Sequence, residues 1–284
     1  VKTICTGISG ASASIKQITT MEMPSDELEA AMTFEARKHI PMDGTDAVID
    51  FQILGSNQRE VDKIDVGLVA CTKGVLTSHM DLLKECGLKP GVVDTYPIAM
   101  SNAFTFIKTM PDDGLVVILD IGAVSSSLVV YGSGEQFFTR DLPIGGHHFV
   151  KELSDRKEIS YTEAQDVLYK DGLAASISNS TDAPLTSVGI AERTIYDNLV
   201  EDLRRSLRFY AKQTGQSFFL KIFLSGGGAE TPGLTEFVSS KLNIECDLFD
   251  PFENVNGGEN ISVNNKSQYT IALGLGIRGG MANE

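Results

Sequence analysis

One stretch, Leu115–Tyr131, constrains this chain more than any other. It consists of an aliphatic run that ends at Asp120, a turn with Gly122, and a second apolar run preceded by the hydroxyls of Ser125, Ser126 and Ser127. A continuous aliphatic run predicts a strand that is buried on both faces. A carboxylate, a glycine and hydroxyls at the end of such a strand favour a site for phosphate oxygens and hydrated Mg²⁺. An ordinary tight turn is the alternative interpretation.

A second glycine-rich stretch has the same position relative to a buried strand. The run Phe218–Leu224 leads directly into Ser225 and the glycines Gly226, Gly227 and Gly228, and a helix is predicted to follow. Glycines at the end of a strand let the backbone approach a flat or anionic ligand closely. The spacing matches neither a Rossmann fingerprint nor a Walker A loop, and a flexible turn is the alternative. A nucleotide between the two stretches explains both of them.

The composition narrows the classes of partner. The chain has 284 residues, 42% of them hydrophobic, and a net charge of -14. An acidic chain is a poor candidate for binding nucleic acid or anionic lipid. Four scattered cysteines without a CxxC pair favour reduced thiols in a cytosolic protein. No apolar run reaches the roughly 18 residues that span a bilayer, and no signal peptide is recognised.

Periodicity and turn signals predict an α/β chain. An αββαβ module is expected first, with Ser25 as the N-cap of its first helix; its later parts are the paired strands Ala47–Leu54 and Ile64–Cys71, the helix Gly74–Cys86 and the strand Lys89–Asp94. A helix over Tyr96–Met110 follows. The Leu115–Tyr131 hairpin and Gln136–Arg140 are expected to form an antiparallel meander.

Residues 150–190 are expected to be helical with a loop at Ser176–Ala183. The long helix Ile190–Gln213 is expected to carry an apolar stripe, formed by Ile195, Leu199, Leu203, Leu207 and Tyr210. A helix ending at Leu242, the strand Ile244–Leu248 and a helix over Tyr269–Ile277 follow, the last with close packing at Ala272, Gly274 and Gly276.

Several of these residues resemble a known superfamily. Asp120–Gly122 resembles the second phosphate motif of the actin-like ATPases, Ser225–Gly228 their adenosine motif, and Ala272–Gly276 their second connecting helix. More narrowly, strings along nearly the whole chain are similar to the PilM family, the actin-like cytoplasmic proteins of type IV pilus assembly, which are related to FtsA. These strings are Glu35–Pro41, Asp50–Gly55, Thr139–Gly146, Arg205–Tyr210, Pro232–Leu234 and Asp250–Asn254.

The resemblance implies a two-lobed actin-like ATPase fold with the αββαβ module inserted in the first lobe. The expected domains are 1–113, the remainder of the first lobe with the module at about 20–95; 114–267, the second lobe with a helical subdomain at about 147–217; and 268–284, a helix returning to the first lobe. The family begins with a phosphate-binding hairpin that does not precede Val1. We therefore expect a fragment that lacks this hairpin and the N-terminal part of the first lobe.

The resemblance also implies a ligand, ATP with Mg²⁺ in the interlobe cleft. Asp120 is the expected Mg²⁺ ligand, directly or through water, and the candidate catalytic residue. Gly122, Ser125 and Ser126 are expected to face the β- and γ-phosphates, Gly226, Gly227 and Gly228 to border the adenosine, and Asp202, Arg205 and Ser206 to reach ribose or base. A surface i,i+3 ion pair is the alternative for Asp202 and Arg205. We interpret His147 and His148 as residues at the start of a helix.

The function implied by the resemblance is a nucleotide-binding scaffold. Its expected partners are the cytoplasmic tail of the inner-membrane protein PilN and other pilus-assembly proteins, with self-association as a further expectation. Its expected location is cytoplasmic, peripheral to the inner membrane through these partners. Any ATPase turnover would be slow, because Asp120 is the one candidate catalytic group. A small-molecule kinase and an FtsA-like division scaffold are the alternatives, and Arg278–Glu284 does not resemble the amphipathic membrane helix that ends FtsA.

Overall fold

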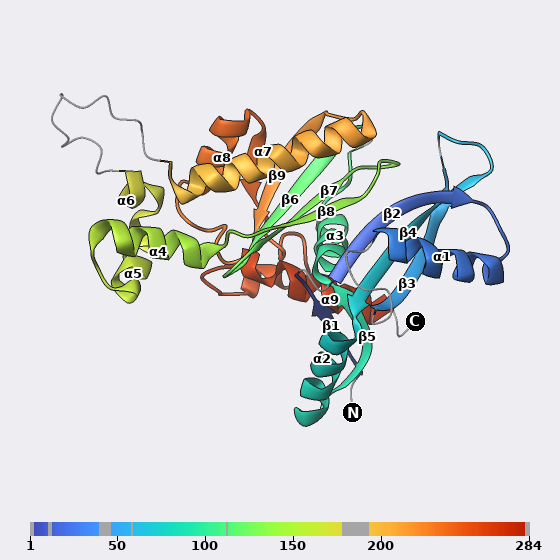
Figure 1. Cartoon of the computed structure of the whole chain (residues 1–284). Coiled ribbons are helices and arrows are strands. Elements are labelled where there is room, and N and C mark those ends of the chain that lie inside the picture. Colours follow the sequence, from blue (N-terminus) through green and yellow to red (C-terminus); the bar gives the residue numbers. More distant parts are fainter. Residues whose placement is uncertain are drawn as a thin grey trace. The chain divides into compact units, whose positions relative to one another are not determined.

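The structure is a computed structural model that describes residues 3–10, 13–39, 47–57, 59–111, 113–177 and 193–281 (Figure 1). The chain divides into two compact units. Unit 1 comprises Val1–Ala103, Gly134–Thr139 and Ile271–Glu284, and unit 2 comprises Phe104–Ser133 and Arg140–Thr270. The functional domains expected from the sequence stay a prediction. Among the described residues, no helix combines the length and the hydropathy needed to cross a bilayer.

In unit 1, a three-stranded antiparallel sheet carries one helix. Its strand order is β2-β4-β3, formed by β2 (Ala13–Met21), β3 (Ala47–Ser56) and β4 (Lys63–Thr72), with α1 (Ser25–His39) packed on one face. Alternate residues of β4 are buried, as expected when one face of a sheet meets a helix. This core consists of Leu28 and Met32 from the helix and Ile64, Val66, Leu68 and Ala70 from the strand. The predicted pairing of β3 with β4 is confirmed.

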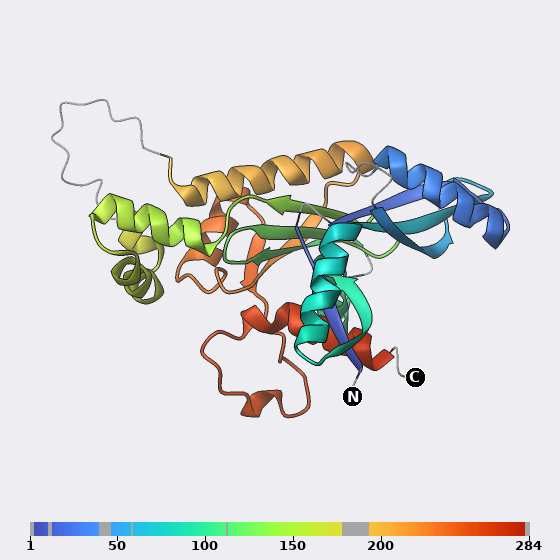
Figure 2. The same ribbon diagram turned by 60° about the horizontal axis from the view of Figure 1, so that its bottom comes forward.

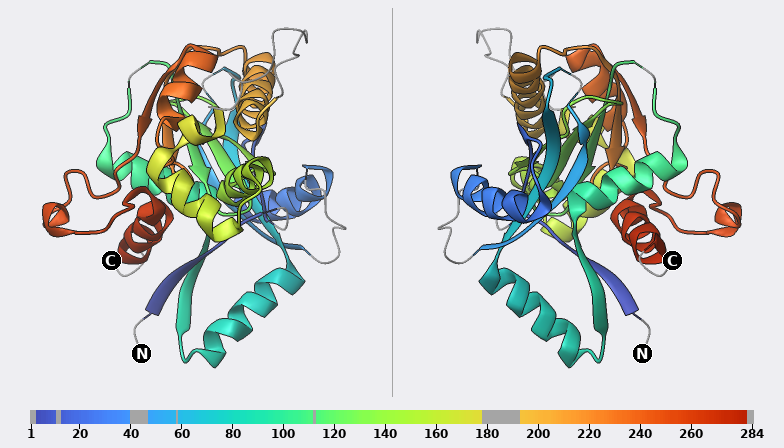
Figure 3. Two further views of the ribbon diagram at one scale, coloured as in Figure 1. Left: turned by 90° about the vertical axis from the view of Figure 1, so that its left-hand side faces the viewer. Right: turned by 90° about the vertical axis from the view of Figure 1, so that its right-hand side faces the viewer.

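The rest of unit 1 is a parallel strand pair with helices. β1 (Thr3–Ile8) pairs with β5 (Lys89–Thr95), and Figure 3 shows α2 (Lys73–Glu85) beside β5. α3 (Tyr96–Ile107) ends three residues before the predicted end at Met110. α9 (Thr270–Met281) packs closely on α3, since a Cβ at Gly274 would lie 1.8 Å from the Ala99 carbonyl oxygen. The close packing predicted at Gly276 is wrong, because that position faces open space.

Unit 2 is built on a five-stranded sheet of order β10-β9-β6-β7-β8. All seven residues of the central strand β6 (Leu115–Ile121) are buried, as its aliphatic sequence predicts. β7 (Ser126–Tyr131) is antiparallel to β6, and β9 (Phe219–Ser225) is parallel to β6 on its other edge. β8 (Phe138–Leu142) and β10 (Glu245–Leu248) complete the two edges. The parallel pairing of β6 and β9 is not predictable from either strand alone.

The longest helix of unit 2, α7 (Ile195–Thr214), lies along this sheet (Figure 2). Its buried side chains include Leu199, Leu203, Leu207 and Tyr210, which confirms most of the predicted apolar stripe. The helix begins at Ile195 rather than Ile190, because Thr194 is its N-cap; residues 190–192 and most of the predicted Ser176–Ala183 loop lie outside the described residues. The remaining helices of unit 2 are α4 (Gly146–Lys157), α5 (Tyr161–Asp171), α6 (Leu173–Ile177) and α8 (Leu234–Leu242).

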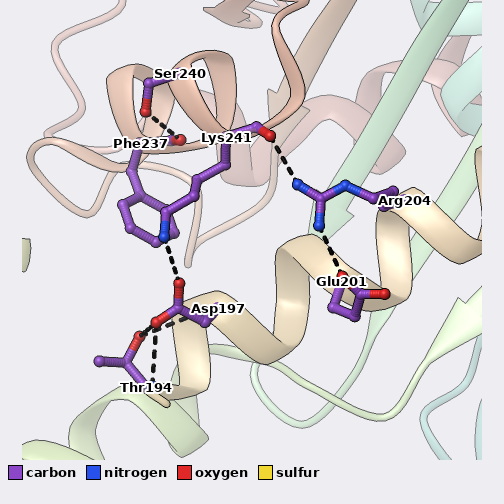
Figure 4. Close-up of polar contacts among 7 residues, drawn as sticks. All are labelled: Thr194, Asp197, Glu201, Arg204, Phe237, Ser240 and Lys241. Carbon is purple, nitrogen blue, oxygen red and sulfur yellow. Dashed lines mark hydrogen bonds and ion pairs between the residues drawn. The ribbon is translucent and has the colours of Figure 1, made fainter. Parts of the chain in front are cut away.

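Polar contacts attach the first half of α7 to α8 (Figure 4). Asp197 completes a capping box with Thr194 and also accepts a 2.7 Å bond from Lys241 Nζ. Two turns later, Arg204 donates to the Lys241 carbonyl oxygen at 2.7 Å and pairs with Glu201. Burial raises the pKa of Asp197, but the bonds from Lys241 and Thr194 outweigh it and hold that pKa below its usual value. The charged residues near the start of α7 therefore serve mainly to fix the helix.

Candidate functional site

Asp120 and Ser225 face each other where β6 and β9 end. The two residues are partners in the parallel register, and Ser225 Oγ donates to Asp120 Oδ2 at 3.0 Å. Ser225 Oγ also lies 2.7 Å from Thr270 Oγ1, which donates to the Ser267 carbonyl oxygen at 2.8 Å. All four residues are buried. Each hydroxyl carries one proton that it can donate in either direction. The hydrogen bonds of this chain can therefore point toward a charged Asp120 or away from a protonated one.

Burial controls the charge on Asp120. Its side chain is only 8% exposed, and desolvation raises its pKa to about 6, while the hydrogen bond from Ser225 acts in the opposite direction. The second carboxylate oxygen, Oδ1, has no partner among the described residues. A buried carboxylate with one unpartnered oxygen is stabilised by a nearby cation or by a water that a cation orients. Asp120 is therefore the residue of this site that is best suited to a metal.

The glycines around Asp120 let three chain segments pack backbone to backbone. We call this packing the glycine junction and define it by Gly122, Gly145, Gly146, Gly226 and Gly228. A Cβ at Gly226 would lie 2.6 Å from the Ile121 carbonyl oxygen, and one at Gly145 would lie 2.7 Å from that of Gly122. Gly226 also has φ +84°, a conformation that favours glycine. The fold therefore requires glycine at Gly122, Gly145, Gly226 and Gly228 whether or not a ligand binds, whereas a Cβ at Gly146 would make only ordinary contacts.

Three glycine N–H groups of the junction already have hydrogen-bond acceptors. The N–H of Gly228 donates to Ile121 O at 2.9 Å, that of Gly226 to Ser267 O at 3.1 Å, and that of Gly122 to Ser125 O at 3.1 Å. These three N–H groups are therefore not free to donate to phosphate oxygens. Gly227 differs, because it is exposed and its N–H has no partner among the described residues. The hairpin tip, residues 123–125, is exposed as well.

The three serines after this tip have different surroundings. Ser125 is exposed, whereas Ser126 is fully buried and its Oγ donates to the Ile144 carbonyl oxygen at 2.6 Å. Ser127 donates to Asp141 Oδ1 at 2.8 Å. Successive side chains of a strand point to opposite faces, so neighbouring hydroxyls cannot all face one ligand. We therefore leave Ser126 out of the candidate site and keep Ser125.

The structure does not bring Asp202, Arg205 and Ser206 to the glycine junction through any hydrogen bond or ion pair among the described residues. Ser206 is fully buried in α7, and its Oγ donates to the Asp202 carbonyl oxygen at 2.7 Å. Arg205 Nη1 lies 3.4 Å from Asp202 Oδ1, and Arg205 Nε lies 3.6 Å from Glu201 Oε1. These contacts match the alternative interpretation, a pair on the surface of one helix.

Two residues that the sequence did not single out as a site lie beside the junction. The N–H of His147 donates to the Ala123 carbonyl oxygen at 2.8 Å, so His147 borders the hairpin tip. Its Nδ1 lies 3.1 Å from Tyr161 Oη, and the two ring centroids are 5.3 Å apart. His148, by contrast, accepts a bond from the Gly145 N–H and caps α4, as its predicted helix-entry role requires. The sequence feature that could have pointed to His147 is its position directly after Gly145 and Gly146.

The residues present limit how a metal can be held. No cluster of three or more His, Cys, Asp or Glu side chains with ligand geometry occurs in the part of the chain that the structure describes. Asp120 alone cannot supply the six oxygens that Mg²⁺ requires. The site therefore fits a Mg²⁺ ion that keeps most of its waters and takes further oxygens from a phosphate ligand.

Comparison with solved structures shows the fold. The chain is similar to a structure described as a PilM–PilN type IV pilus biogenesis complex, with a TM-score of 0.76 and 24% identity, covering 96% of this chain and 78% of that one. The predicted α/β actin-like fold is confirmed. Curated relatives include the cell division protein FtsA of Staphylococcus epidermidis, 22% identical over 205 residues, which is 66% of this chain and 43% of that protein.

FtsA of Bacillus subtilis is a similar relative, 23% identical over 217 residues, or 72% of this chain and 48% of that protein. The chain thus aligns with less than half the length of these FtsA relatives. The family model for type IV pilus assembly protein PilM matches residues 1–280, nearly the whole sequence. The chain therefore belongs to the PilM family of type IV pilus assembly proteins.

Proposed function

We propose that this protein is a scaffold of the type IV pilus assembly platform at the cytoplasmic side of the inner membrane, and that its unit 2 binds ATP with Mg²⁺. The observation that carries this proposal is the buried Asp120 beside the glycine junction. Keeping this buried carboxylate ionised costs free energy, as its raised pKa indicates, unless a cation binds beside it. The exposed tip with Ser125, together with the N–H of Gly227, provides neighbouring donors for phosphate oxygens.

In this proposal the residues act mainly by binding. Asp120 orients a water of the Mg²⁺ hydration shell, and Ser225 and Thr270 hold the carboxylate in place through their hydroxyls. The bound Mg²⁺ would neutralise phosphate charge. Asp120 is also the one candidate for orienting an attacking water, so we expect at most a slow ATPase. A conformational role for the nucleotide is therefore favoured over rapid turnover.

The expected partner is the cytoplasmic tail of PilN. Membership of the PilM family and the fold shared with the PilM–PilN complex support this partner. The relatives of the FtsA type support a second candidate, a division scaffold. A binding assay with full-length native protein and the PilN tail peptide of the same organism separates the two, with a scrambled peptide as control. Failure of the native tail to bind would exclude the pilus partner.

Calorimetry with Mg-ATP on the full-length protein tests the nucleotide proposal. Asp120→Asn keeps the shape of the side chain but removes its charge, so we expect weaker binding by about tenfold or more, since hydrogen bonds to charged groups contribute about 1.5–3 kcal/mol. Asp171→Asn, at the exposed end of α5, is the matched control and should bind as the wild type does. Equal affinities of wild type and Asp120→Asn would refute the assignment of Asp120.

A further inference from the structure

A hollow of about 310 Å³ opens on the surface of unit 2 between α7, the start of β9 and the turn from α8 to β10. β9 begins beside this hollow at Phe219 and ends at Ser225, which bonds Asp120. The length of the strand therefore separates the hollow from the candidate nucleotide site. We call the hollow the α7 groove and define it by its apolar lining, which consists of Leu207, Ala211, Phe219, Leu242 and Ile244.

The apolar lining of the α7 groove keeps much of its surface in contact with water. Leu207 is the one buried residue of the five, whereas Ala211, Phe219, Leu242 and Ile244 are partly exposed. Ala211 contributes a single methyl group to the groove, and a longer side chain at this position of α7 would occupy part of the space. Concave apolar surface of this kind gains free energy when a partner side chain covers it.

The polar groups at the rim of the groove differ in whether they have partners. Arg204 already has partners in α7 and α8, so its guanidinium is held in place. Arg208 and Ser217 also line the groove and are exposed, and their side chains have no hydrogen bond or ion pair among the described residues. The helix dipole does not account for Arg208, because the basic residue in the last turn of α7 is Lys212.

The charge and size of the groove favour one kind of occupant. The chain has a net charge of -14, so an exposed guanidinium without an ion-pair partner is a place where a carboxylate of another molecule is attracted. Arg208 and the Ser217 hydroxyl both supply donors, which match carboxylate oxygens. The volume is at the low end of ligand pockets, which span roughly 300–1,000 Å³. The groove therefore matches a large apolar side chain next to a carboxylate, a combination that a peptide provides.

We infer that the α7 groove docks a peptide segment of another protein, in which an acidic residue lies beside a large aliphatic or aromatic one. The apolar side chain enters the groove, and the carboxylate pairs with Arg208 and accepts a hydrogen bond from Ser217. This inference does not depend on the proposed binding of ATP, since the groove and Asp120 lie at opposite ends of β9. Arg208→Ala should therefore leave Mg-ATP affinity unchanged, and failure of either proposal can be told from failure of the other.

Selection from a random peptide library tests the inference on the full-length protein. Phage that display short random peptides are first depleted on immobilised Arg208→Ala and then selected on the wild type. We expect the enriched peptides to share an acidic residue beside a Leu, Ile or Phe, because depletion removes peptides that bind elsewhere. A selection that yields no such motif would overturn the inference.

Fluorescence anisotropy with the best selected peptide tests the charged half of the groove. Arg208→Ala should weaken binding by about tenfold, as expected for a lost hydrogen bond to a charged group. Arg205→Ala is the matched control, since Arg205 lies on the same helix, is 63% exposed and does not line the groove; it should not weaken binding. A peptide with an amide in place of its carboxylate should bind wild type and Arg208→Ala equally. If the two changes instead add, Arg208 does not bind the carboxylate and the inference is overturned.

A second variant tests the apolar half. Ala211→Phe places a ring in the groove and should abolish binding of the selected peptide, and thermal unfolding checks that this variant is folded. Serine in place of the apolar residue of the peptide tests the same contact without changing the protein, and it should weaken binding by about tenfold or more. Undiminished binding in these two measurements would overturn the inference. Sedimentation that shows self-association of the wild type, lost in Arg208→Ala, would assign the groove to a second copy of the chain and overturn it as well.

Discussion

The glycine junction and the middle of α7 were both predicted to touch a nucleotide, and they differ in how their polar groups are satisfied. On α7, Asp202, Arg205 and Ser206 find partners within the same helix. At the junction, Asp120 is buried, its pKa is raised, and one of its oxygens lacks a partner among the described residues. A buried polar group whose charge costs free energy in the folded protein is a better indication of a ligand than a group that already has its hydrogen-bond partners. Four predictions test this contrast, from the largest effect to the smallest.

The strongest test concerns the close packing of the glycine junction. We expect Gly226→Ala to lower the free energy of unfolding of unit 2 by about 3 kcal/mol, because φ is +84° there and the new Cβ would meet the Ile121 carbonyl at 2.6 Å. Gly227→Ala is the adjacent control, since nothing lies within 4 Å of its Cβ, and it should change stability by less than about 0.5 kcal/mol. Urea unfolding measures both. Similar losses in the two variants would mean that packing is not the cause.

The second prediction concerns the pH dependence that Asp120 imposes without ligand. Its pKa rises from 3.8 when unfolded to about 6 when folded, so the folded state binds more protons between these values. Stability should therefore fall by about 2–3 kcal/mol as pH rises from 4 to 6.5, and then level off. Comparing the wild-type and Asp120→Asn unfolding curves isolates this contribution. Identical pH profiles would show that burial does not perturb Asp120.

The third prediction concerns the attachment of α7. Thr194→Ala removes the hydroxyl that caps the helix and bonds Asp197, so we expect a loss of about 1 kcal/mol in the free energy of unfolding. Thr194→Ser retains the hydroxyl and should recover most of that loss. Thermal or urea unfolding measures the difference. A serine variant as unstable as the alanine variant would point to lost methyl packing instead.

The smallest effect is expected for the predicted base-binding residues of α7. The Arg205 side chain is 63% exposed, and its ion pairs are of the surface type. Arg205→Ala should change stability by less than about 0.5 kcal/mol and leave Mg-ATP affinity unchanged. Calorimetry beside the Asp120→Asn variant checks both ends of the comparison. A marked loss of ATP affinity in Arg205→Ala would mean that α7 contributes to nucleotide binding.

Much of the fold could be predicted from local patterns in the sequence. The aliphatic run before Asp120 predicted a buried strand, and Ile64–Cys71 was predicted as the partner strand of Ala47–Leu54. Less of the candidate site could be predicted in this way. Ser125 and Ser126 are chemically identical in the sequence, but strand geometry sends the Ser126 hydroxyl to Ile144 and leaves Ser125 exposed. The pairing of His147 with Tyr161 depends on how α4 and α5 meet, and no local pattern reports it.

Local patterns in the sequence predict most of the strands and helices, the glycines that interrupt them and the family resemblance, because burial periodicity and turn chemistry are local properties. The parallel pairing of β9 with β6 arises only in the folded chain, where Ser225 bonds Asp120 and burial raises the pKa of Asp120. The same packing occupies the amides of Gly122, Gly226 and Gly228. Desolvation and hydrogen-bond partners depend on neighbours that are distant in sequence. For Asp120–Gly122, these neighbours decide which of its polar groups are left for a ligand.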